Sequence, residues 1–201
     1  MPEIAIAPGE FALYSDACIR AGWRHYSVGG KPQPKRYGPA MGAWIGWLGC
    51  PPRTRPTVAG QAYLGQHGNN KAEYVAAIHA LQAVLVHARL KQIAVERVVL
   101  RVDNEVVAKT LKHEWATTDL TPHRVLAEET KAEMEAAGTK VEIQQVSRTN
   151  HEFRRAHTMS QQAWDQVLVK TEWRPPKKPP EPAPAKSSST SGDELIIFQL
   201  P

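Results

Sequence analysis

Residues 69–78, which read NNKAEYVAAI, open the longest helical pattern in the chain. The apolar positions recur at spacings of three and four residues, which predicts a helix with one buried face that runs to about residue 90. These positions are Val75, Ile78, Leu81 and Leu85. Asparagine is favoured at helix N-caps, so Asn69 and Asn70 are predicted to mark the helix start. Glu73, the only acidic residue of the stretch, places one carboxylate near that start.

Two strand-like runs each lead into an aspartate. Residues 11–15 (FALYS) precede Asp16, and residues 98–102 (VVLRV) precede Asp103. Two strand ends and a helix start can meet at one edge of a sheet, which would bring the three carboxylates together. Because clustered carboxylates repel one another, such an arrangement usually holds a hard divalent cation, Mg²⁺ or Mn²⁺. The pattern predicts a metal-dependent phosphoryl-transfer site; the alternative interpretation is surface charge and helix capping.

Further patterns complete an alternating order of strands and helices. Strands are predicted at residues 11–20, 41–48, 57–64, 95–102 and 140–146, and helices at residues 69–90, 104–112, 121–137 and 153–169. Gly138 is predicted to end the third helix. The order β-β-β-α-β-α-α-β-α is typical of an α/β fold in which helices cover both faces of a five-stranded mixed sheet.

The positive charge of the chain is unevenly distributed. The net charge is only +5, but residues 20–36 contain no acidic residue. Their basic residues are Arg20, Arg24, His25, Lys31, Lys35 and Arg36. Trp23, Tyr26 and Tyr37 lie among or beside them, and cations interleaved with aromatic rings are typical of nucleic-acid contacts. The alternative interpretation is a solvated loop whose aromatic rings pack on the core.

Composition divides the chain into four segments. Residues 1–10 are an N-terminal extension, residues 11–170 form the catalytic domain, and residues 171–192 are a Pro-, Lys- and Ser-rich linker. Residues 193–201 are acidic and then apolar, which favours a docking peptide at Leu195–Leu200 that binds a protein partner. An edge strand added to the same domain is the alternative. Neither a membrane span nor a secretion signal is predicted, so a monomeric cytoplasmic protein is expected.

Four stretches of the sequence resemble, in order and spacing, the motifs of type 1 ribonuclease H. They are residues 14–16 (YSD), 69–78, 102–104 (VDN) and the closing region from 146–148 (VSR) through 156–163 (AHTMSQQA). The resemblance covers about residues 10–169, and the Asn-Asn-x-x-Glu helix start is its most specific part. It implies the ribonuclease H-like fold and an endonuclease that cuts the RNA strand of RNA–DNA hybrids, leaving 5′-phosphate and 3′-hydroxyl ends.

The resemblance also implies a set of metal ligands for two Mg²⁺ or Mn²⁺ ions bound together with substrate. Asp16 would bridge the two ions, and Glu73 and Asp103 would hold the second. The family usually completes the first ion with an aspartate at the start of the final helix, where this chain has His157. A neutral imidazole adds no negative charge and suits Mn²⁺ better than Mg²⁺, so a preference for Mn²⁺ is predicted.

Three interpretations of this departure remain open. His157 is a working ligand, or it marks a weakened or lost active site, or another residue such as Glu152 serves in its place. Two rival functions accompany them. One is a catalytically silent nucleic-acid-binding module of the same fold, and the other is a related exonuclease, which would need a free strand end.

Substrate contacts are predicted at two places. The connection from residue 112 to 121 is too short for the basic helical insertion that some family members use as a handle. Residues 20–37 are predicted to form a loop, and this loop is predicted to bind nucleic acid through Arg20, Trp23, Arg24, Lys35 and Arg36. Asn69, Asn70 and Asn104 are predicted to contact the minor groove of the hybrid, although Asn69 is equally suited to capping its helix.

Overall fold

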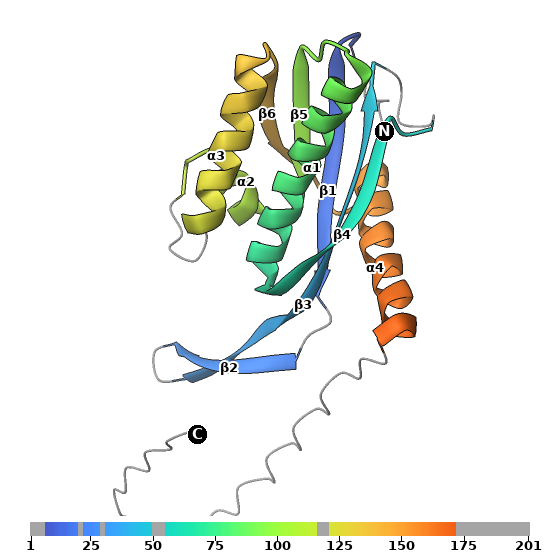
Figure 1. The fold of residues 1–201 in the computed structure, drawn as a ribbon. Helices are drawn as coiled ribbons and strands as arrows, with labels where there is room; N and C mark the ends of the chain where they lie inside the picture. Colours follow the sequence, from blue (N-terminus) through green and yellow to red (C-terminus); the bar gives the residue numbers. More distant parts are fainter. Residues whose placement is uncertain (1–6, 20–21, 29–30, 50–54, 116–120, 172–201) are drawn as a thin grey trace, which may run out of the picture.

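The computed structural model of the protein describes residues 7–19, 22–28, 31–49, 55–115 and 121–171. This part of the chain contains six strands and four helices (Figure 1). The strands are β1 (Glu10–Ile19), β2 (Gly22–Val28), β3 (Lys31–Leu48), β4 (Val58–Gly68), β5 (Arg97–Val102) and β6 (Lys140–Gln145). The helices are α1 (Asn69–Lys91), α2 (Glu105–Leu111), α3 (Thr121–Ala136) and α4 (His151–Thr171). The predicted α/β fold is thereby confirmed, with one additional strand.

The strands form one mixed sheet with β1 near its centre. The order is β2-β3-β1-β5-β6, and β4 also pairs with β3. The pairs β1–β3 and β3–β4 are antiparallel, whereas β1–β5 and β5–β6 are parallel. The parallel half brings the carboxyl ends of β1 and β5 to the same edge of the sheet.

The additional strand corrects the prediction of a loop at residues 20–37. Residues 22–28 and 31–37 pair with each other as an antiparallel ribbon, and β3 then continues into the sheet without a break. Pro32 and Pro34 concealed the ribbon in the sequence, because proline is unusual inside a strand. Its strand structure comes from pairing between two neighbouring segments rather than from the propensity of either one.

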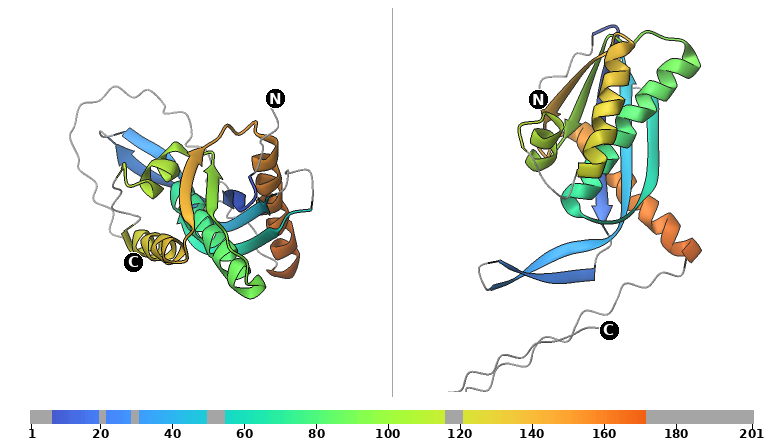
Figure 2. Two further views of the ribbon diagram at one scale, coloured as in Figure 1. Left: turned by 90° about the horizontal axis from the view of Figure 1, so that it is seen from above. Right: turned by 60° about the vertical axis from the view of Figure 1, so that its left-hand side comes forward.

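Helices cover both faces of the sheet. Figure 2 shows α4 on one face and α1 with α3 on the other. Alternate residues of β1 follow this division: Phe11 and Leu13 belong to the apolar cluster under α1, and Ala12 and Tyr14 belong to the cluster under α4. The core thus consists of two layers with the sheet between them.

Close packing of α1 on the sheet sets the position of its first turns. Ala72, Ala76 and Ala77 are fully buried, which allows the helix backbone to approach the strands. A Cβ atom added to Gly42 of β3 would lie 3.0 Å from Ala76 Cβ and 2.9 Å from Leu64 Cδ1. Because α1 lies this close to the backbone of β3, the side chain of Glu73 is buried at the sheet edge.

The helix ends agree with the sequence in part. Asn104 accepts hydrogen bonds from the backbone N–H groups of Val106 and Val107 and so caps α2. The capping prediction for Asn69 and Asn70 is wrong. The N-cap residue of α1 is Gly68, and no side chain makes a capping hydrogen bond at this helix start. Gly138, at φ +81°, follows the end of α3 as predicted.

No helix within the described ranges is long and apolar enough to cross a membrane. The predicted linker, apart from Thr171 at the end of α4, and the docking peptide lie outside the described residues, so both stay predictions.

Candidate active site

Three carboxylates meet at one edge of the sheet. At this edge β1 and β5 end and α1 begins (Figure 1). Asp16 lies in β1, Glu73 in the second turn of α1, and Asp103 directly after β5. One oxygen atom from each residue lies within 4.8 Å of the other two. Asp16 and Glu73 are each only 5% exposed, so their charges are largely removed from water. The structure therefore brings together the three acidic residues singled out in the sequence.

The strand register explains why two of these carboxylates are neighbours. Tyr14 of β1 is paired with Arg101 of β5, and Asp16 and Asp103 each lie two residues further along. Residues two apart point to the same face of a strand, so the two aspartates leave the sheet level with each other and on one face. Glu73 reaches them from the start of α1.

Glu73 has the most strongly perturbed electrostatics of the three. Its pKa is raised from 4.5 to about 8, chiefly by burial and in addition by the charges of Asp103 and Asp16. Its Oε1 atom accepts a hydrogen bond from Asn69, whereas Oε2 is buried without any hydrogen-bond partner. A buried carboxylate oxygen with no donor, among two further carboxylates, fits a hard divalent cation.

Asp16 is held from the other side by α4. Its Oδ2 atom lies 2.9 Å from His157 Nδ1 and 3.1 Å from Ser160 Oγ. Ser160 is fully buried, and its hydroxyl also lies 2.8 Å from the carbonyl oxygen of His157. These contacts orient the Asp16 carboxylate independently of any ion. The hydrogen bond to Asp16 is also the main reason why the pKa of His157 is raised.

His157 uses both ring nitrogens for contacts with protein groups. Gln161 Nε2 lies 3.0 Å from His157 Nε2, which fits an imidazole that carries its proton on Nδ1 and accepts at Nε2. The ring is beside Asp16 but is not a member of the three-carboxylate group. Its role as a metal ligand therefore stays a prediction.

Glu152, the alternative to His157, lies elsewhere. It is in the first turn of α4, where its Oε1 atom is 3.7 Å from His151 Nδ1 and its charge acts on Tyr14. His157 and not Glu152 lines the cleft that contains the carboxylates. The geometry favours His157 as the residue that stands in for the missing aspartate.

Arg148 brings a positive charge to the site. Its Nε atom donates a hydrogen bond to Asp103 Oδ2, and this contact raises the pKa of Arg148. The side chain of Arg148 is 78% exposed, whereas that of Asp103 is 5% exposed. The guanidinium thus enters from solvent and offsets part of the negative charge of the cluster, with other N–H groups still available to an incoming anion.

These groups border one open cleft of about 640 Å³. Its lining residues are Asp16, Ala17, Cys18, Ile19, Asn69, Glu73, Asp103, Arg148, Phe153, Arg154, His157 and Gln161. Its lining combines the three acids with Arg148 and Arg154, from α4 and the segment before it. A phosphate group can approach such a surface only when cations offset the acidic charge.

The residues predicted to contact nucleic acid fall into two groups. Asn104 Nδ2 donates to Asn70 Oδ1 at 3.0 Å, and Asn69 bonds to Glu73, so the three asparagines lie together beside the acids. Trp23, Arg24, Lys35 and Arg36 belong to the β2–β3 ribbon, whose side chains are outside the described part of the structure. Arg20 falls entirely outside the described residues.

Comparisons with known proteins agree with this fold. No family model and no curated protein matches the sequence. Among solved structures, RNase H1 from the halophilic archaeon Halobacterium salinarum NRC-1 is 27% identical, with a TM-score of 0.56 over 78% of this chain and 98% of that chain. LC11-RNase H1, isolated from compost, is 20% identical, with a TM-score of 0.59 over 80% of this chain and 99% of that chain. The structure of LC11-RNase H1 in complex with an RNA/DNA hybrid is 19% identical, with a TM-score of 0.59 over 79% of this chain and 99% of that chain.

The fold and the acidic site define an α/β protein of the ribonuclease H-like class. In structure the chain is similar to RNase H1 proteins, among them the Halobacterium protein at 27% identity.

Three residues of the site were not singled out from the sequence. Ser160 and Gln161 lie three and four residues after His157, the spacing at which helical side chains share a face. That spacing could have indicated them once His157 was chosen. Arg148 carries no comparable signal, because its contact with Asp103 joins two loops 45 residues apart.

Substitution of His157 tests its contribution. His157→Ala is expected to lower metal-dependent cleavage of a hybrid by about tenfold to a hundredfold, the range known for groups that orient metal ligands. His157→Asp is expected to shift the preference toward Mg²⁺, because it adds a fourth carboxylate. The measurement is the initial rate against metal concentration for Mg²⁺ and Mn²⁺ separately. If both variants depended on Mg²⁺ and Mn²⁺ concentration as wild type does, His157 would have no role in metal binding. The control is Gln162→Ala, at an exposed position further along the same helix.

Proposed function

We propose that the protein is a metal-dependent endoribonuclease that hydrolyses the RNA strand of RNA–DNA hybrids and leaves 5′-phosphate and 3′-hydroxyl ends. One observation carries the proposal. A buried carboxylate oxygen of Glu73 has no hydrogen-bond partner, and the Glu73 carboxylate lies beside those of Asp16 and Asp103 at the sheet edge of a ribonuclease H fold. The structure of a similar protein, LC11-RNase H1, in complex with an RNA/DNA hybrid supports the choice of substrate.

The residues present fit Mg²⁺ or Mn²⁺. Asp16, Glu73 and Asp103 supply oxygen donors, and His157 supplies a nitrogen donor once its ring is released from Asp16. Bound as a pair together with substrate, such ions would activate water and stabilise the leaving 3′-oxygen in an in-line displacement. A nitrogen donor in place of a fourth carboxylate favours Mn²⁺ over Mg²⁺.

The protein groups around the ligands have separate tasks. Ser160 contacts the Asp16 carboxylate from α4, and this contact can persist when the ring of His157 is released from Asp16. Arg148 offsets the charge of Asp103 and can donate to a phosphate oxygen of the RNA strand. The asparagines at the starts of α1 and α2 supply donors and acceptors for 2′-hydroxyl and base-edge groups in the minor groove.

A cleavage assay with two metals tests the proposal. An end-labelled hybrid with internal RNA is incubated with the protein in Mg²⁺ and separately in Mn²⁺, alongside the same hybrid in circular, end-free form. Internal RNA cuts in both substrates, with faster cutting in Mn²⁺, are expected. Hybrid binding without cutting in either metal would favour the silent module, and cutting only of the substrate with free ends would favour the exonuclease.

A cytoplasmic location, a monomeric state and a protein partner for Leu195–Leu200 remain proposals that follow from the composition alone.

A further inference from the structure

A layer of cationic and aromatic side chains lies on the α4 face of the sheet, next to the acidic site. Tyr14 of β1 and Arg101 of β5 are paired in register, and they come two residues before Asp16 and Asp103. Residues two apart along a strand share a face, so this pair occupies the position adjacent to the two aspartates. The Arg101 guanidinium lies over the Tyr14 ring, 5.4 Å from its centroid. The proposed reaction uses neither side chain.

This layer connects the sheet to the first turns of α4. Tyr14 contacts Trp47 of β3 edge to face, with 6.2 Å between the ring centroids. The guanidinium of Arg155, in α4, lies over Trp47 at 5.0 Å from the ring centroid. Both aromatic side chains are fully buried, so these contacts are shielded from water. The layer therefore links three strands to the helix that carries His157 and Ser160.

Two polar atoms of the layer have unmet hydrogen-bonding capacity. Within the described part of the chain, the Tyr14 hydroxyl and Arg101 Nη1 are buried and have no hydrogen-bond partner. Arg101 is only 5% exposed, and its Nε atom donates to Gln144 Oε1 at 3.2 Å. An unpaired buried polar group is costly, and such a group in a protein usually has a partner or a function. A hydroxyl and a cation that both lack a partner point to an acceptor nearby.

Glu152 is a suitable acceptor. It lies in the first turn of α4 with a side chain that is 19% exposed. Its Oε1 atom is 3.7 Å from His151 Nδ1, which is too far for a hydrogen bond. Burial raises the pKa of Tyr14, Arg101 lowers it and Glu152 raises it, so both charges act on the hydroxyl. A phenol hydroxyl can accept from a guanidinium and donate to a carboxylate at the same time.

We propose that Tyr14 is a positioning residue whose hydroxyl accepts a hydrogen bond from Arg101 and donates one to Glu152. Rotation of the Glu152 side chain away from the exposed ring of His151 brings its carboxylate toward the hydroxyl. Each of the three groups thereby gains a hydrogen bond that involves a charge, which is the stronger class. The bridge joins β1, β5 and the first turn of α4 in one hydrogen-bonded unit.

The bridge acts on the acidic site through α4. His157 and Ser160 follow Glu152 on the same helix, and both contact Asp16. A first turn that is held on the sheet fixes where these side chains meet the Asp16 carboxylate. Outer residues that orient metal ligands typically change metal affinity by about tenfold to a hundredfold. This inference rests on the proposed function, because the positioned carboxylate is a proposed metal ligand.

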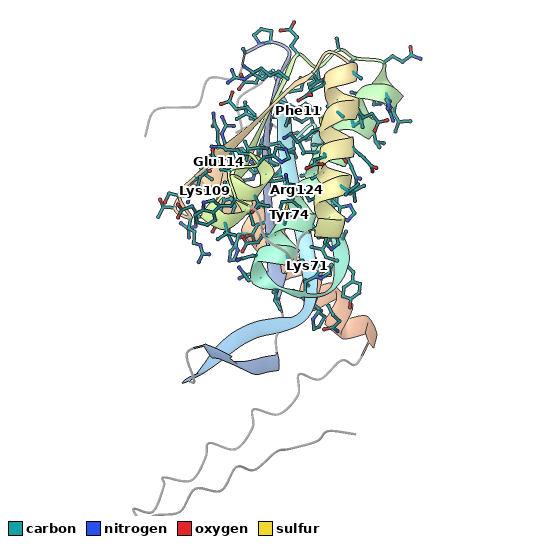
Figure 3. The ribbon with its side chains drawn as sticks, turned by 90° about the vertical axis from the view of Figure 1, so that its left-hand side faces the viewer. Phe11, Lys71, Tyr74, Lys109, Glu114 and Arg124 are labelled. Atoms are coloured by element: carbon teal, nitrogen blue, oxygen red, sulfur yellow. The ribbon has the colours of Figure 1, made fainter. Side chains whose placement is uncertain are left out.

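Removal of the hydroxyl separates this role from packing. Tyr14→Phe keeps the ring that contacts Arg101 and Trp47 and removes only the hydroxyl. If the hydroxyl were unpaired, its removal would leave stability unchanged or raise it. The bridge predicts the opposite, a loss of about tenfold or more in the folding equilibrium constant, measured by urea unfolding in a chelator. Tyr74→Phe is the matched control, because Tyr74 of α1 is also buried and lies beside Arg124 of α3 on the opposite face of the sheet (Figure 3).

A double-mutant cycle with Glu152→Ala shows whether the two groups pair. Tyr14→Phe should cost at least about fivefold less in the folding equilibrium constant when Glu152 is already replaced. The affinity for Mn²⁺ is measured from the rise in melting temperature across a metal series. Tyr14→Phe is expected to bind Mn²⁺ about tenfold more weakly than wild type, and Tyr74→Phe as tightly as wild type.

Additive effects of Tyr14→Phe and Glu152→Ala on stability would overturn the bridge, and Mn²⁺ binding by Tyr14→Phe as tight as in wild type would overturn the positioning role. Both measurements are made without nucleic acid, so they do not depend on cleavage. A protein that shows the expected coupling and Mn²⁺ affinities but never cuts hybrids would therefore refute the proposed function alone.

Discussion

Asp16→Asn is expected to lower cleavage of the hybrid by on the order of a thousandfold or more, while the protein remains folded. Loss of one well-placed hydrogen-bond donor in an active site already costs about 10²–10³ in rate, and Asp16 combines a charge with a central position. It belongs to the three-carboxylate group and also receives both α4 contacts, from His157 and Ser160. Asparagine keeps one oxygen acceptor for these contacts but removes the charge that a cation needs.

The measurement is the single-turnover rate on end-labelled hybrid, together with the thermal melting of the metal-free protein. Removal of one charge from a repelling cluster relieves repulsion, so the melting temperature should not fall. Glu135→Gln, an exposed carboxylate on α3, is the control and should cleave at the wild-type rate. Cleavage by Asp16→Asn within tenfold of wild type would show that the chemistry occurs at another site.

Glu73→Gln is expected to abolish cleavage and, in the absence of metal, to stabilise the protein at alkaline pH. The pKa of Glu73 is about 8 in the folded state and near 4.5 when unperturbed. Between these values the folded protein binds a proton that the unfolded chain has released, so this group makes stability fall as pH rises. The loss is complete above about pH 8. Glutamine carries no charge and removes this penalty.

The expected difference in the free energy of unfolding is on the order of a few kcal/mol at pH 9, since each unit of pKa shift corresponds to about 1.4 kcal/mol. It should vanish near pH 4.5. Urea unfolding in a chelator, from pH 4.5 to 9, measures it. Added Mn²⁺ should then stabilise wild type and not Glu73→Gln. If the free energy of unfolding of wild type and of Glu73→Gln depended on pH in the same way, the pKa of Glu73 would not be raised in the folded protein. Glu135→Gln is the control and should follow wild type throughout.

Much of the fold could be predicted because the signals are local. The three- and four-residue spacing of apolar positions after Glu73 predicted α1, and the apolar runs before Asp16 and Asp103 predicted β1 and β5. Parallel strands whose polar residues follow the apolar run must present those residues at one edge, so the acidic cluster followed from the same signals. The ribbon was wrongly predicted as a loop, because Pro32 and Pro34 disguise a strand that exists only through its pairing with β2.

The sequence by itself determined the order of elements apart from β2, and the ends at which Asp16, Glu73 and Asp103 lie, since each of these depends on residues a few positions away. Only the tertiary structure decided how the carboxylates behave. His157 meets Asp16 across 141 residues of sequence, and Arg148 meets Asp103 across 45. The raised pKa of Glu73 arises from burial under packed elements and from two neighbouring charges. Desolvation and charge proximity are properties of the assembled core, and no local pattern of residues contains them.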